Sequence, residues 1–183
     1  MLAVAEAEQL PVAAARAGDA SAWDALFRRY QLPLYVYVYE LVRNEQTALD
    51  VVQETFINAT RYLGSLREDR KFGSWLFSIA HQKCQQNWRK PRRDEPFDEN
   101  YLELAGEEPW PGELLIRAEQ EEEFMSTLNL LPEIHRSVLL LHFLEEFSLD
   151  EIARVTGVNI GTVKSRLHYA KKSLRTLLTE RTA

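Results

Sequence analysis

Basic and hydroxyl side chains follow one face of a predicted helix in the last quarter of the sequence. These residues are Thr162, Lys164, Ser165, Arg166, His168, Tyr169 and Lys172. Such side chains hydrogen-bond to phosphates and to base edges in the major groove of DNA. The apolar positions of the same segment, from Val163 to Leu177, recur at steps of three and four. That spacing predicts an amphipathic helix whose polar face is exposed.

A shorter helix is predicted directly before this one. Ser148 is a good N-cap residue, and Glu151, three residues later, completes a capping box. Gly157 can take the left-handed conformation of a sharp turn, and Asn159 can then cap the following helix. The segment 148–178 therefore predicts a helix-turn-helix that reads DNA. The alternative is a plain amphipathic hairpin with a solvated basic face.

A second basic stretch covers residues 71–93, with six Lys and Arg and no acidic residue. Four aromatic residues are interleaved with these cations: Phe72, Trp75, Phe77 and Trp88. Cations and stacking surfaces together are typical of single-strand binding. The preceding loop, 64–71, is the expected site for capture of an unstacked base. Because Phe72 and Trp75 also share helical spacing with Ile79, two of the four aromatics are expected in the core.

The net charge of −6 conceals an uneven distribution along the chain. Residues 94–123 carry twelve carboxylates and one basic residue, Arg117, whereas from Arg154 onward seven Lys and Arg oppose Glu180. Two basic segments separated by an acidic one predict two nucleic-acid contacts and a connector that avoids DNA. Prolines and glycines within 94–112 also favour a linker.

The N-terminal part of the sequence reads as helical. A helix is expected to begin near Asp19 or Ser21, and Pro33 should kink or end it. The tract 34–42 alternates like a strand but is assigned to helix, because no partner strand is visible. Further helices are expected over 45–63, 70–90, from about 113, and after Pro132.

The sequence thus predicts an all-α fold of two small helical domains joined by an acidic linker, the C-terminal one a helix-turn-helix. A chain of 183 residues, 45% of them hydrophobic, can bury one core or two small ones. The expected ranges are 1–19 for an N-terminal extension, 20–93 for the first domain, 94–113 for the linker and 114–183 for the second domain.

Several classes of function are disfavoured. The single cysteine, Cys84, excludes an internal disulfide framework and suits a reducing compartment. Apolar runs are too short to cross a bilayer, and a secretory leader is lacking, so a cytoplasmic protein without membrane contact is expected. The histidines lack metal-ligand spacing and a phosphate-binding glycine loop is missing, so we expect no enzyme, no cofactor and no metal. These histidines are His81, His135, His142 and His168.

Three stretches together resemble bacterial RNA polymerase sigma factors of the sigma-70 family. They are TALDVVQETFINA, FGSWLFSIAHQKCQQNWRK and LNLLPEIHRSVLLLHFLEEFSLDEIARVTGVNIGTVKSRL. The compact spacing resembles the extracytoplasmic-function (group IV) type, over about residues 20–93 and 114–180. The resemblance implies a transcription initiation factor that binds core RNA polymerase and promoter DNA, double- and single-stranded. It also implies an anti-sigma factor as a partner, and a monomer outside the holoenzyme.

The resemblance assigns roles to particular residues. The residues expected to bind core polymerase are Asp50, Gln53 and Glu54. Binding of the minus-ten element by region 2 falls to Lys71, Ser74, Trp75, Ser78, His81, Gln82, Gln85, Gln86, Trp88 and Arg89. Binding of the minus-thirty-five element by region 4 falls to Thr162, Lys164, Ser165, Arg166, Tyr169 and Lys172.

The chain departs from the family pattern at several of these places. His81, Gln82 and Gln86 stand where Arg, Asn and Asp are frequent, which alters the expected minus-ten preference. In the second domain Glu146 replaces a frequent glycine, and Tyr169 stands where Arg is usual. A contact to DNA is therefore lost there or exchanged for an apolar one.

Two other readings remain open on the residues alone. One is an autonomous helix-turn-helix regulator with an N-terminal dimerisation or sensing domain, and the other is an RNA-binding or structural helical protein. A repressor usually dimerises to match paired half-sites, whereas a sigma factor acts as a monomer with polymerase. Oligomeric state therefore discriminates between the first two classes.

Overall fold

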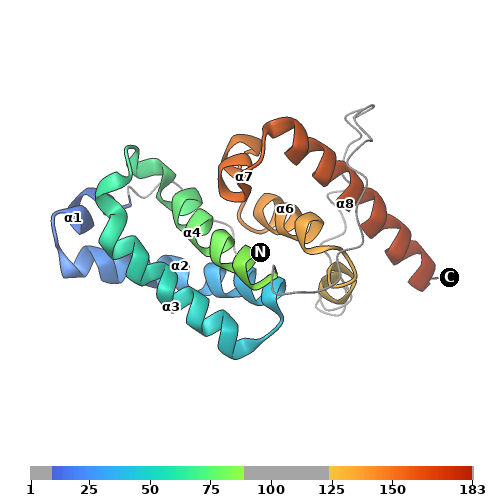
Figure 1. The fold of residues 1–183 in the computed structure, drawn as a ribbon, viewed down its shortest axis with the longest axis horizontal. Coiled ribbons are helices and arrows are strands. Elements are labelled where there is room, and N and C mark those ends of the chain that lie inside the picture. The colour runs from blue at the N-terminus through green and yellow to red at the C-terminus, as the bar shows by residue number, and fades with distance from the viewer. Residues whose placement is uncertain (1–9, 89–123, 183) are drawn as a thin grey trace.

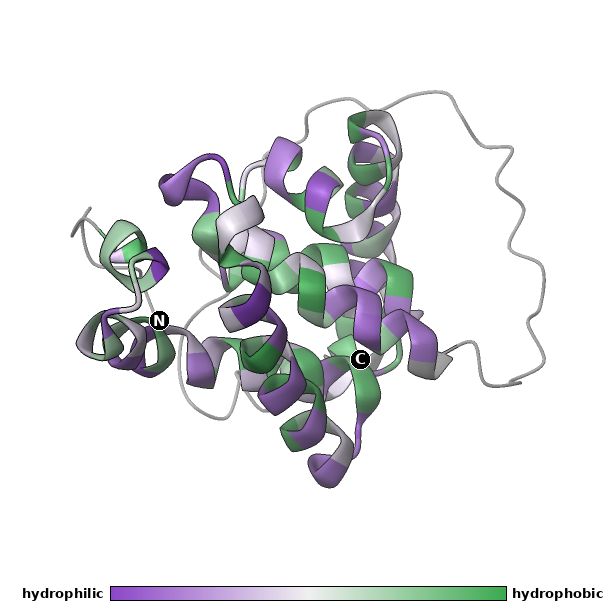
Figure 2. Ribbon diagram, turned by 60° about the vertical axis from the view of Figure 1, so that its left-hand side comes forward, coloured by the Kyte–Doolittle hydropathy of each residue, from purple (hydrophilic) through white to green (hydrophobic). Residues whose placement is uncertain are grey.

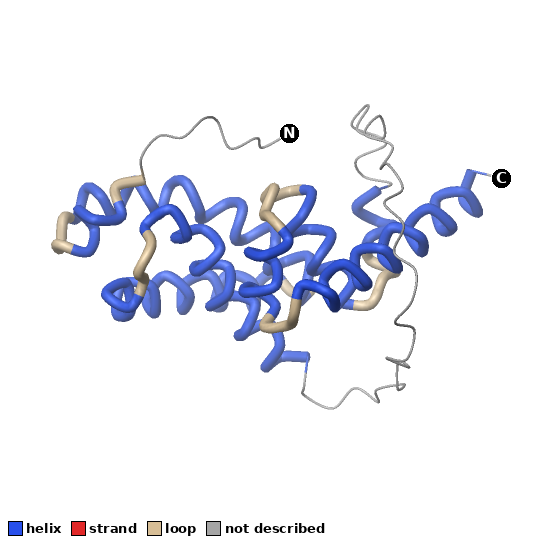
Figure 3. Tube along the Cα trace, turned by 90° about the horizontal axis from the view of Figure 1, so that it is seen from above, coloured by secondary structure: helices blue, strands red, loops and turns tan. Residues whose placement is uncertain are grey.

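The computed structural model describes residues 10–88 and 124–182, and all regular elements within these ranges are helical (Figure 3). The expected linker and the helix expected from about residue 113 lie largely outside them. The first half contains α1 (Val12–Arg16), α2 (Ala20–Val42), α3 (Glu45–Tyr62), the short 3-10 turns η1 (Leu63–Ser65) and η2 (Asp69–Lys71), and α4 (Phe72–Trp88). The second half contains α6 (Glu133–Phe143), α7 (Leu149–Thr156) and α8 (Ile160–Thr182), after a helical segment at 124–128. The all-α prediction is confirmed for the described residues.

Helix α2 begins where the sequence predicts and continues further than expected. The Asp19 carboxylate accepts a hydrogen bond from the Ser21 amide at 2.8 Å, which caps the first turn. The helix does not end at Pro33 but runs to Val42, so the helical assignment of 34–42 is correct. Leu34 and Val38, on the turns after the proline, are fully buried. Burial of this apolar face offsets the cost of an internal proline, about 3 kcal/mol.

Helices α3 and α4 follow the predicted pattern closely. The side chain of Asn44 caps α3 by accepting from the Thr47 amide at 2.8 Å. All six positions on its apolar stripe are buried: Ala48, Val51, Val52, Phe56, Ala59 and Leu63. Helix α4 begins at Phe72, two residues later than predicted, because Asp69–Lys71 forms the turn η2.

The second half contains the predicted helix-turn-helix. The amide of Glu151 donates to Ser148 Oγ at 3.3 Å, and the Ser148 amide donates back to the Glu151 carboxylate at 3.0 Å. Gly157 ends α7 in the left-handed conformation, with φ of 70°. Asn159 then caps α8 by accepting from the Thr162 amide at 2.8 Å. The local signals read from the sequence are therefore confirmed.

The two halves of the molecule pack against each other (Figure 1). Helix α4 of the first half lies against α7, and α2 lies against α6. Hydrophobic and hydrophilic segments alternate along the helices, as an amphipathic pattern requires (Figure 2). The buried apolar side chains of both halves form one continuous core, from Val12 to Leu174. The composition of the chain gave no sign of this contact between the halves.

Candidate nucleic-acid and polymerase interfaces

The polar face of α8 is presented at the surface of the second half. Lys164 and Lys172 are exposed, and Thr162, Ser165 and Tyr169 are half-buried at its edges. The hydroxyl of Thr162 is fixed by Asn159 Oδ1 at 3.1 Å, at the N-terminal end of the helix. His168, which was not among the expected minus-thirty-five contacts, is exposed on the same face and packs edge-on to Tyr169, with ring centroids 5.5 Å apart. This surface carries positive charge and hydrogen-bond donors in the arrangement that a major groove requires.

Arg166 is half-buried, like Ser165 and Tyr169, and its charge acts on His81 of α4 and on His135 of α6. Burial, together with this nearby guanidinium, lowers the pKa of His81 to about 4. The same two causes lower the pKa of His135. The side chain expected to read a base is therefore only partly accessible in the isolated chain.

Two of the expected minus-ten contacts on α4 are buried. Ser74 is 4% exposed and His81 is 3% exposed. The His81 ring is held at both nitrogens, with Tyr37 Oη 2.7 Å from Nδ1 and Gln85 Nε2 3.1 Å from Nε2. Ser78 and Gln85 are half-buried on the same side of the helix. On this side His81 is packed against α2 through its bond to Tyr37.

The neighbouring edge of α4 is open to solvent. Gln82 and Gln86 are exposed, and Trp75 is half-buried beside them. These three positions offer two amides and one stacking surface along one edge. The side chain of Trp88 and the whole of Arg89 lie outside the described residues.

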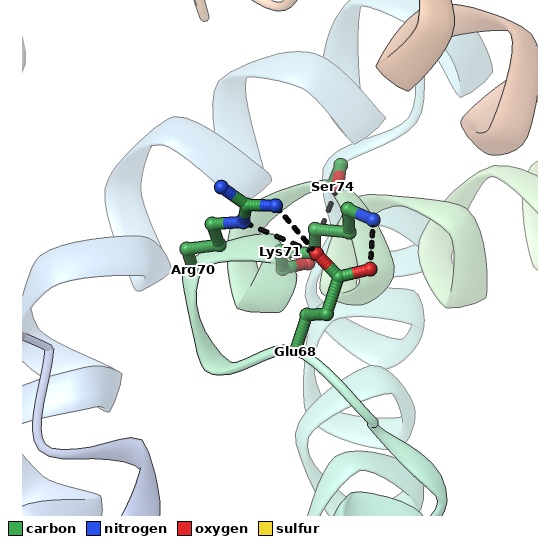
Figure 4. Close-up of polar contacts among 4 residues, drawn as sticks. All are labelled: Glu68, Arg70, Lys71 and Ser74. Carbon is green, nitrogen blue, oxygen red and sulfur yellow. Dashed lines mark hydrogen bonds and ion pairs between the residues drawn. The ribbon is translucent and has the colours of Figure 1, made fainter.

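The loop before α4 is held by a group of ion pairs (Figure 4). The Glu68 carboxylate accepts hydrogen bonds from Arg70 Nη2 at 2.9 Å and from the ammonium of Lys71. These bonds hold the pKa of Glu68 below its ordinary value. Lys71, an expected minus-ten contact, therefore already has a carboxylate partner that a DNA phosphate would have to displace. Ser74 Oγ donates to the Lys71 carbonyl at 3.2 Å and joins this group to α4.

Arg16 ties the same loop to the N-terminal helix. Its Nη2 donates to the Leu66 carbonyl at 3.1 Å and to Asp69 Oδ1 at 2.5 Å. Helix α1 is itself anchored in the core by Val12 and Ala15. This contact could not be predicted from the sequence, because Arg16 lies 50 positions from Leu66 and 53 from Asp69.

The expected polymerase contacts lie together on α3. Asp50, Gln53 and Glu54 are all exposed. Glu54 accepts from Lys83 of α4 at 2.5 Å, and Asp50 accepts from Gln46 at 3.1 Å. The structure adds two exposed apolar residues at helical spacing on the same face, Leu49 at 49% and Ile57 at 41% exposure. Two exposed apolar side chains beside these carboxylates suit a surface that binds a protein.

Other kinds of site are not found in the described part of the chain. It contains no group of three or more His, Cys, Asp or Glu placed to hold a metal ion. Cys84 is buried in α4, and burial raises the pKa of its thiol to about 12, so the sulfur is held as an unreactive thiol. No helix among residues 10–88 and 124–182 has the length and apolar character needed to span a membrane.

The fold and these surfaces define a helical DNA-binding protein with a second surface suited to a protein partner. Residues 26–94 match the family described as Sigma-70 region 2, and residues 121–174 match Sigma-70, region 4. The chain is 34% identical to RNA polymerase sigma-H factor of Pseudomonas aeruginosa, over 96% of this chain and 97% of that protein. It is 28% identical to ECF RNA polymerase sigma factor SigW of Bacillus subtilis, over 86% of this chain and 89% of the relative.

Two solved structures are similar over most of the chain. CnrH in complex with the cytosolic domain of CnrY matches with a TM-score of 0.69 and 27% identity, over 96% of this chain and 99% of that one. The sigma factor RpoE from Bartonella quintana, in complex with the anti-sigma factor NepR, matches with a TM-score of 0.62 and 26% identity, over 84% of this chain and 96% of that one. The chain belongs to the extracytoplasmic-function family of RNA polymerase sigma factors, and it is a transcription initiation factor.

Proposed function

We propose that α3 binds core RNA polymerase, that α4 and the loop before it bind the minus-ten element, and that α8 binds the minus-thirty-five element. The observation that supports this assignment is the presence of three separate polar surfaces on one chain. A simple repressor needs only the surface on α8. The carboxylates and open apolar side chains of α3 have no use in reading DNA, but they suit a protein partner.

The minus-ten surface works by capture and not by catalysis. Removing a base from the stack costs a few kcal/mol, which a pocket for the extruded base and contacts to its strand must offset. The exposed amides of Gln82 and Gln86 can donate to and accept from base edges, and Trp75 offers a stacking surface. The loop 64–71 is the proposed site of base capture. No cofactor or metal takes part in these steps.

Further partners follow from the relatives. CnrH and RpoE were solved with CnrY and with the anti-sigma factor NepR, and we expect a comparable regulator for this chain. The protein should act as a monomer outside the holoenzyme, and in the cytoplasm, where polymerase and chromosome lie. The acidic segment 94–113 should follow a positively charged channel of polymerase, where its carboxylates imitate RNA phosphates.

Run-off transcription on genomic fragments tests the proposed function. Purified core polymerase with this chain should start at defined promoters, whereas core polymerase alone should not. The isolated chain should footprint the same promoters much more weakly than the holoenzyme, because its net charge of −6 weakens attraction to DNA. Tight footprinting by a dimer without polymerase would instead favour the autonomous regulator. Neither the fold nor the comparisons favour that alternative.

A further inference from the structure

Three side chains form a hydrogen-bonded array that connects the core of the first half to the surface of α4. Tyr37 of α2 is 1% exposed and His81 of α4 is 3% exposed, and Tyr37 Oη lies 2.7 Å from Nδ1 of the His81 ring. The Nε2 atom of Gln85, one turn further along α4, lies 3.1 Å from Nε2 of the same ring. Gln85 is half-buried, so the array runs from a buried hydroxyl to a side chain that solvent reaches.

The buried end of this array is held by packing between α2 and α4. The ring of Tyr37 lies 5.3 Å from that of Phe77, which is fully buried. Burial also raises the pKa of Tyr37 well above its ordinary value, so the hydroxyl keeps its proton. Because the hydroxyl is fixed, the His81 ring cannot turn without leaving a buried polar group unsatisfied.

The donors and acceptors in the array determine which way the Gln85 amide points. An amide nitrogen donates and does not accept, so Nε2 of His81 accepts from Gln85. Burial, together with the charge of Arg166, lowers the pKa of His81 to about 4, so the ring is neutral near pH 7 and has one donor and one acceptor. The ring proton therefore lies on Nδ1 and is donated to Tyr37 Oη. The carbonyl oxygen of Gln85, Oε1, is then the atom directed to another partner.

Gln85 is a neighbour of two amides that are proposed to contact the minus-ten element. Gln82 precedes it by three positions, which places the two side chains next to each other on the helix surface. Gln82 and Gln86 are exposed, and of the three amides only that of Gln85 has a hydrogen-bond partner within the described part of the chain. An amide that is already held loses less side-chain entropy on binding. It also distinguishes a donor from an acceptor, whereas an amide that turns freely offers either group.

We propose that Tyr37 and His81 orient the Gln85 amide so that its carbonyl oxygen selects a minus-ten base with an exocyclic amine, which is adenine or cytosine. This inference rests on the proposed minus-ten role of α4. Adenine N6 and cytosine N4 donate, whereas thymine O4 and guanine O6, at the equivalent positions, only accept. A base carbonyl facing Gln85 Oε1 leaves two acceptors without a donor, which costs affinity. Tyr37 and His81 are positioning residues, and Gln85 is the residue that contacts the base.

The tautomer of His81 tests the first step of the inference. Nitrogen chemical shifts of the imidazole, measured by NMR on the full chain, distinguish a protonated from an unprotonated ring nitrogen. Nδ1 should carry the proton in the wild type. In Tyr37→Phe a proton on Nδ1 would be buried without an acceptor, so it should move to Nε2 and be donated to the Gln85 carbonyl, which turns the amide nitrogen outward. A proton on Nε2 in the wild type would overturn the inference.

Base selection by the holoenzyme tests the second step. Core polymerase with the full chain transcribes templates randomised across the minus-ten element, and the transcribed templates are sequenced. At one position the wild type should favour adenine and cytosine about ten-fold over thymine and guanine, as expected for one hydrogen bond made or left unmade. Gln85→Ala should remove this preference. Tyr37→Phe should shift it toward thymine and guanine, although the buried Tyr37 cannot touch DNA.

Tyr35→Phe and Gln82→Ala are the matched controls. Tyr35 is half-buried on the same helix as Tyr37 and stacks on Tyr39, with ring centroids 5.9 Å apart. Loss of its hydroxyl should leave both the His81 tautomer and the base preference unchanged. Gln82→Ala removes an amide that is not held, so it should weaken initiation from the templates generally and keep the preference for adenine and cytosine.

Two results of the selection overturn the inference. One is an unchanged base preference in Gln85→Ala, and the other is a wild-type preference for thymine or guanine at the position that Gln85→Ala affects. If the holoenzyme still selects a minus-ten sequence in either case, the proposed function stands and only the orientation of Gln85 is rejected. If the wild-type holoenzyme transcribes all templates equally, the proposed minus-ten role itself fails. Should Tyr37→Phe lose its fold, the wild-type tautomer and Gln85→Ala still decide.

Discussion

Arg16 donates to the Asp69 carboxylate at 2.5 Å and, with the same nitrogen, to the Leu66 carbonyl at 3.1 Å. The first contact involves two half-exposed side chains and contributes little to global stability. The second contact fixes a main-chain carbonyl in the loop proposed to capture a base. We therefore expect Arg16 to act as a positioning residue, which orders the loop through these two contacts.

Arg16→Ala should shorten the lifetime of the promoter open complex while the melting temperature changes little. A loop that must be ordered on binding loses affinity, and exposed ion pairs contribute only about 0.2–1 kcal/mol to stability. Open-complex dissociation after a competitor challenge measures the first quantity, and thermal unfolding measures the second. Arg16→Lys keeps the charge but lacks the planar guanidinium with its fixed set of donors. This variant should therefore recover only part of the open-complex lifetime. Full recovery by lysine would mean that only charge matters at this position.

Glu146→Gly should stabilise the protein by about 0.5–1 kcal/mol. Glu146 is exposed and has a φ of 55°, in the left-handed region where a side chain is strained. Glycine has no Cβ and relieves the strain at this backbone angle. Glu146→Ala removes the carboxylate but keeps Cβ, so it is the control that should give no gain. Denaturant unfolding of the three proteins distinguishes backbone strain from charge, and equal stability of all three would exclude strain.

The predictable parts of this fold are those that short-range sequence signals specify, such as helix caps and turns. The capping box of Ser148 and the turn at Gly157 lie within ten residues of each other, and the structure forms both as predicted. By contrast, Arg136 meets the Glu40 carbonyl across 96 positions of sequence. Periodicity reports which face of a helix is buried but not which helix covers it. For that reason the burial of His81, whose ring is bonded to Tyr37 of α2, could not be read from the sequence.

Glu145→Gln should raise stability at pH 8 by about 2 kcal/mol, less than the full pKa shift implies because the carboxyl is only half-buried. Burial raises the pKa of Glu145 from 4.5 to about 7. The folded chain therefore holds a proton that the unfolded chain releases between these values. Stability from this group is fully present below about pH 4.5 and is lost as pH rises toward 7.

Thermal unfolding from pH 5 to 8 measures this difference. The gain from Glu145→Gln should be small at pH 5 and grow with pH. Glu146→Gln, on the exposed neighbour, should change stability little at either pH. A gain for Glu145→Gln that is the same at both pH values would show that the wild-type carboxyl does not titrate in this range.

Asp50→Ala combined with Glu54→Ala should weaken binding to core polymerase and leave the fold intact. Both carboxylates are exposed, and such changes usually alter stability by no more than about 0.5 kcal/mol. Glu54 also pairs with Lys83, so Lys83→Ala controls for loss of that ion pair. A pull-down with core polymerase should show reduced binding for the double variant and wild-type binding for Lys83→Ala. Equal binding by the wild type, the double variant and Lys83→Ala would show that these carboxylates of α3 do not contribute to polymerase binding.

Arg166→Ala and Lys172→Ala should differ in how they change sequence preference. Arg166 lies one turn into α8, close enough to the helix N-terminus to enter the major groove, and arginine can pair with guanine at two points. Its loss should cost about 1–3 kcal/mol and relax preference at one position of the minus-thirty-five element. Lys172, exposed further along the helix, should contact phosphate only. Its loss should weaken all sequences about equally and lower the salt slope by about one.

Holoenzyme binding to single-base variants of the element, at several salt concentrations, separates these two roles. The holoenzyme is required because in the isolated chain Arg166 is half-buried, and its removal there would also change its packing. If Arg166→Ala weakens every variant of the element equally, its contact is to the DNA backbone. Base reading would then fall to Thr162, Ser165 or Tyr169, whose side chains border the same face of α8.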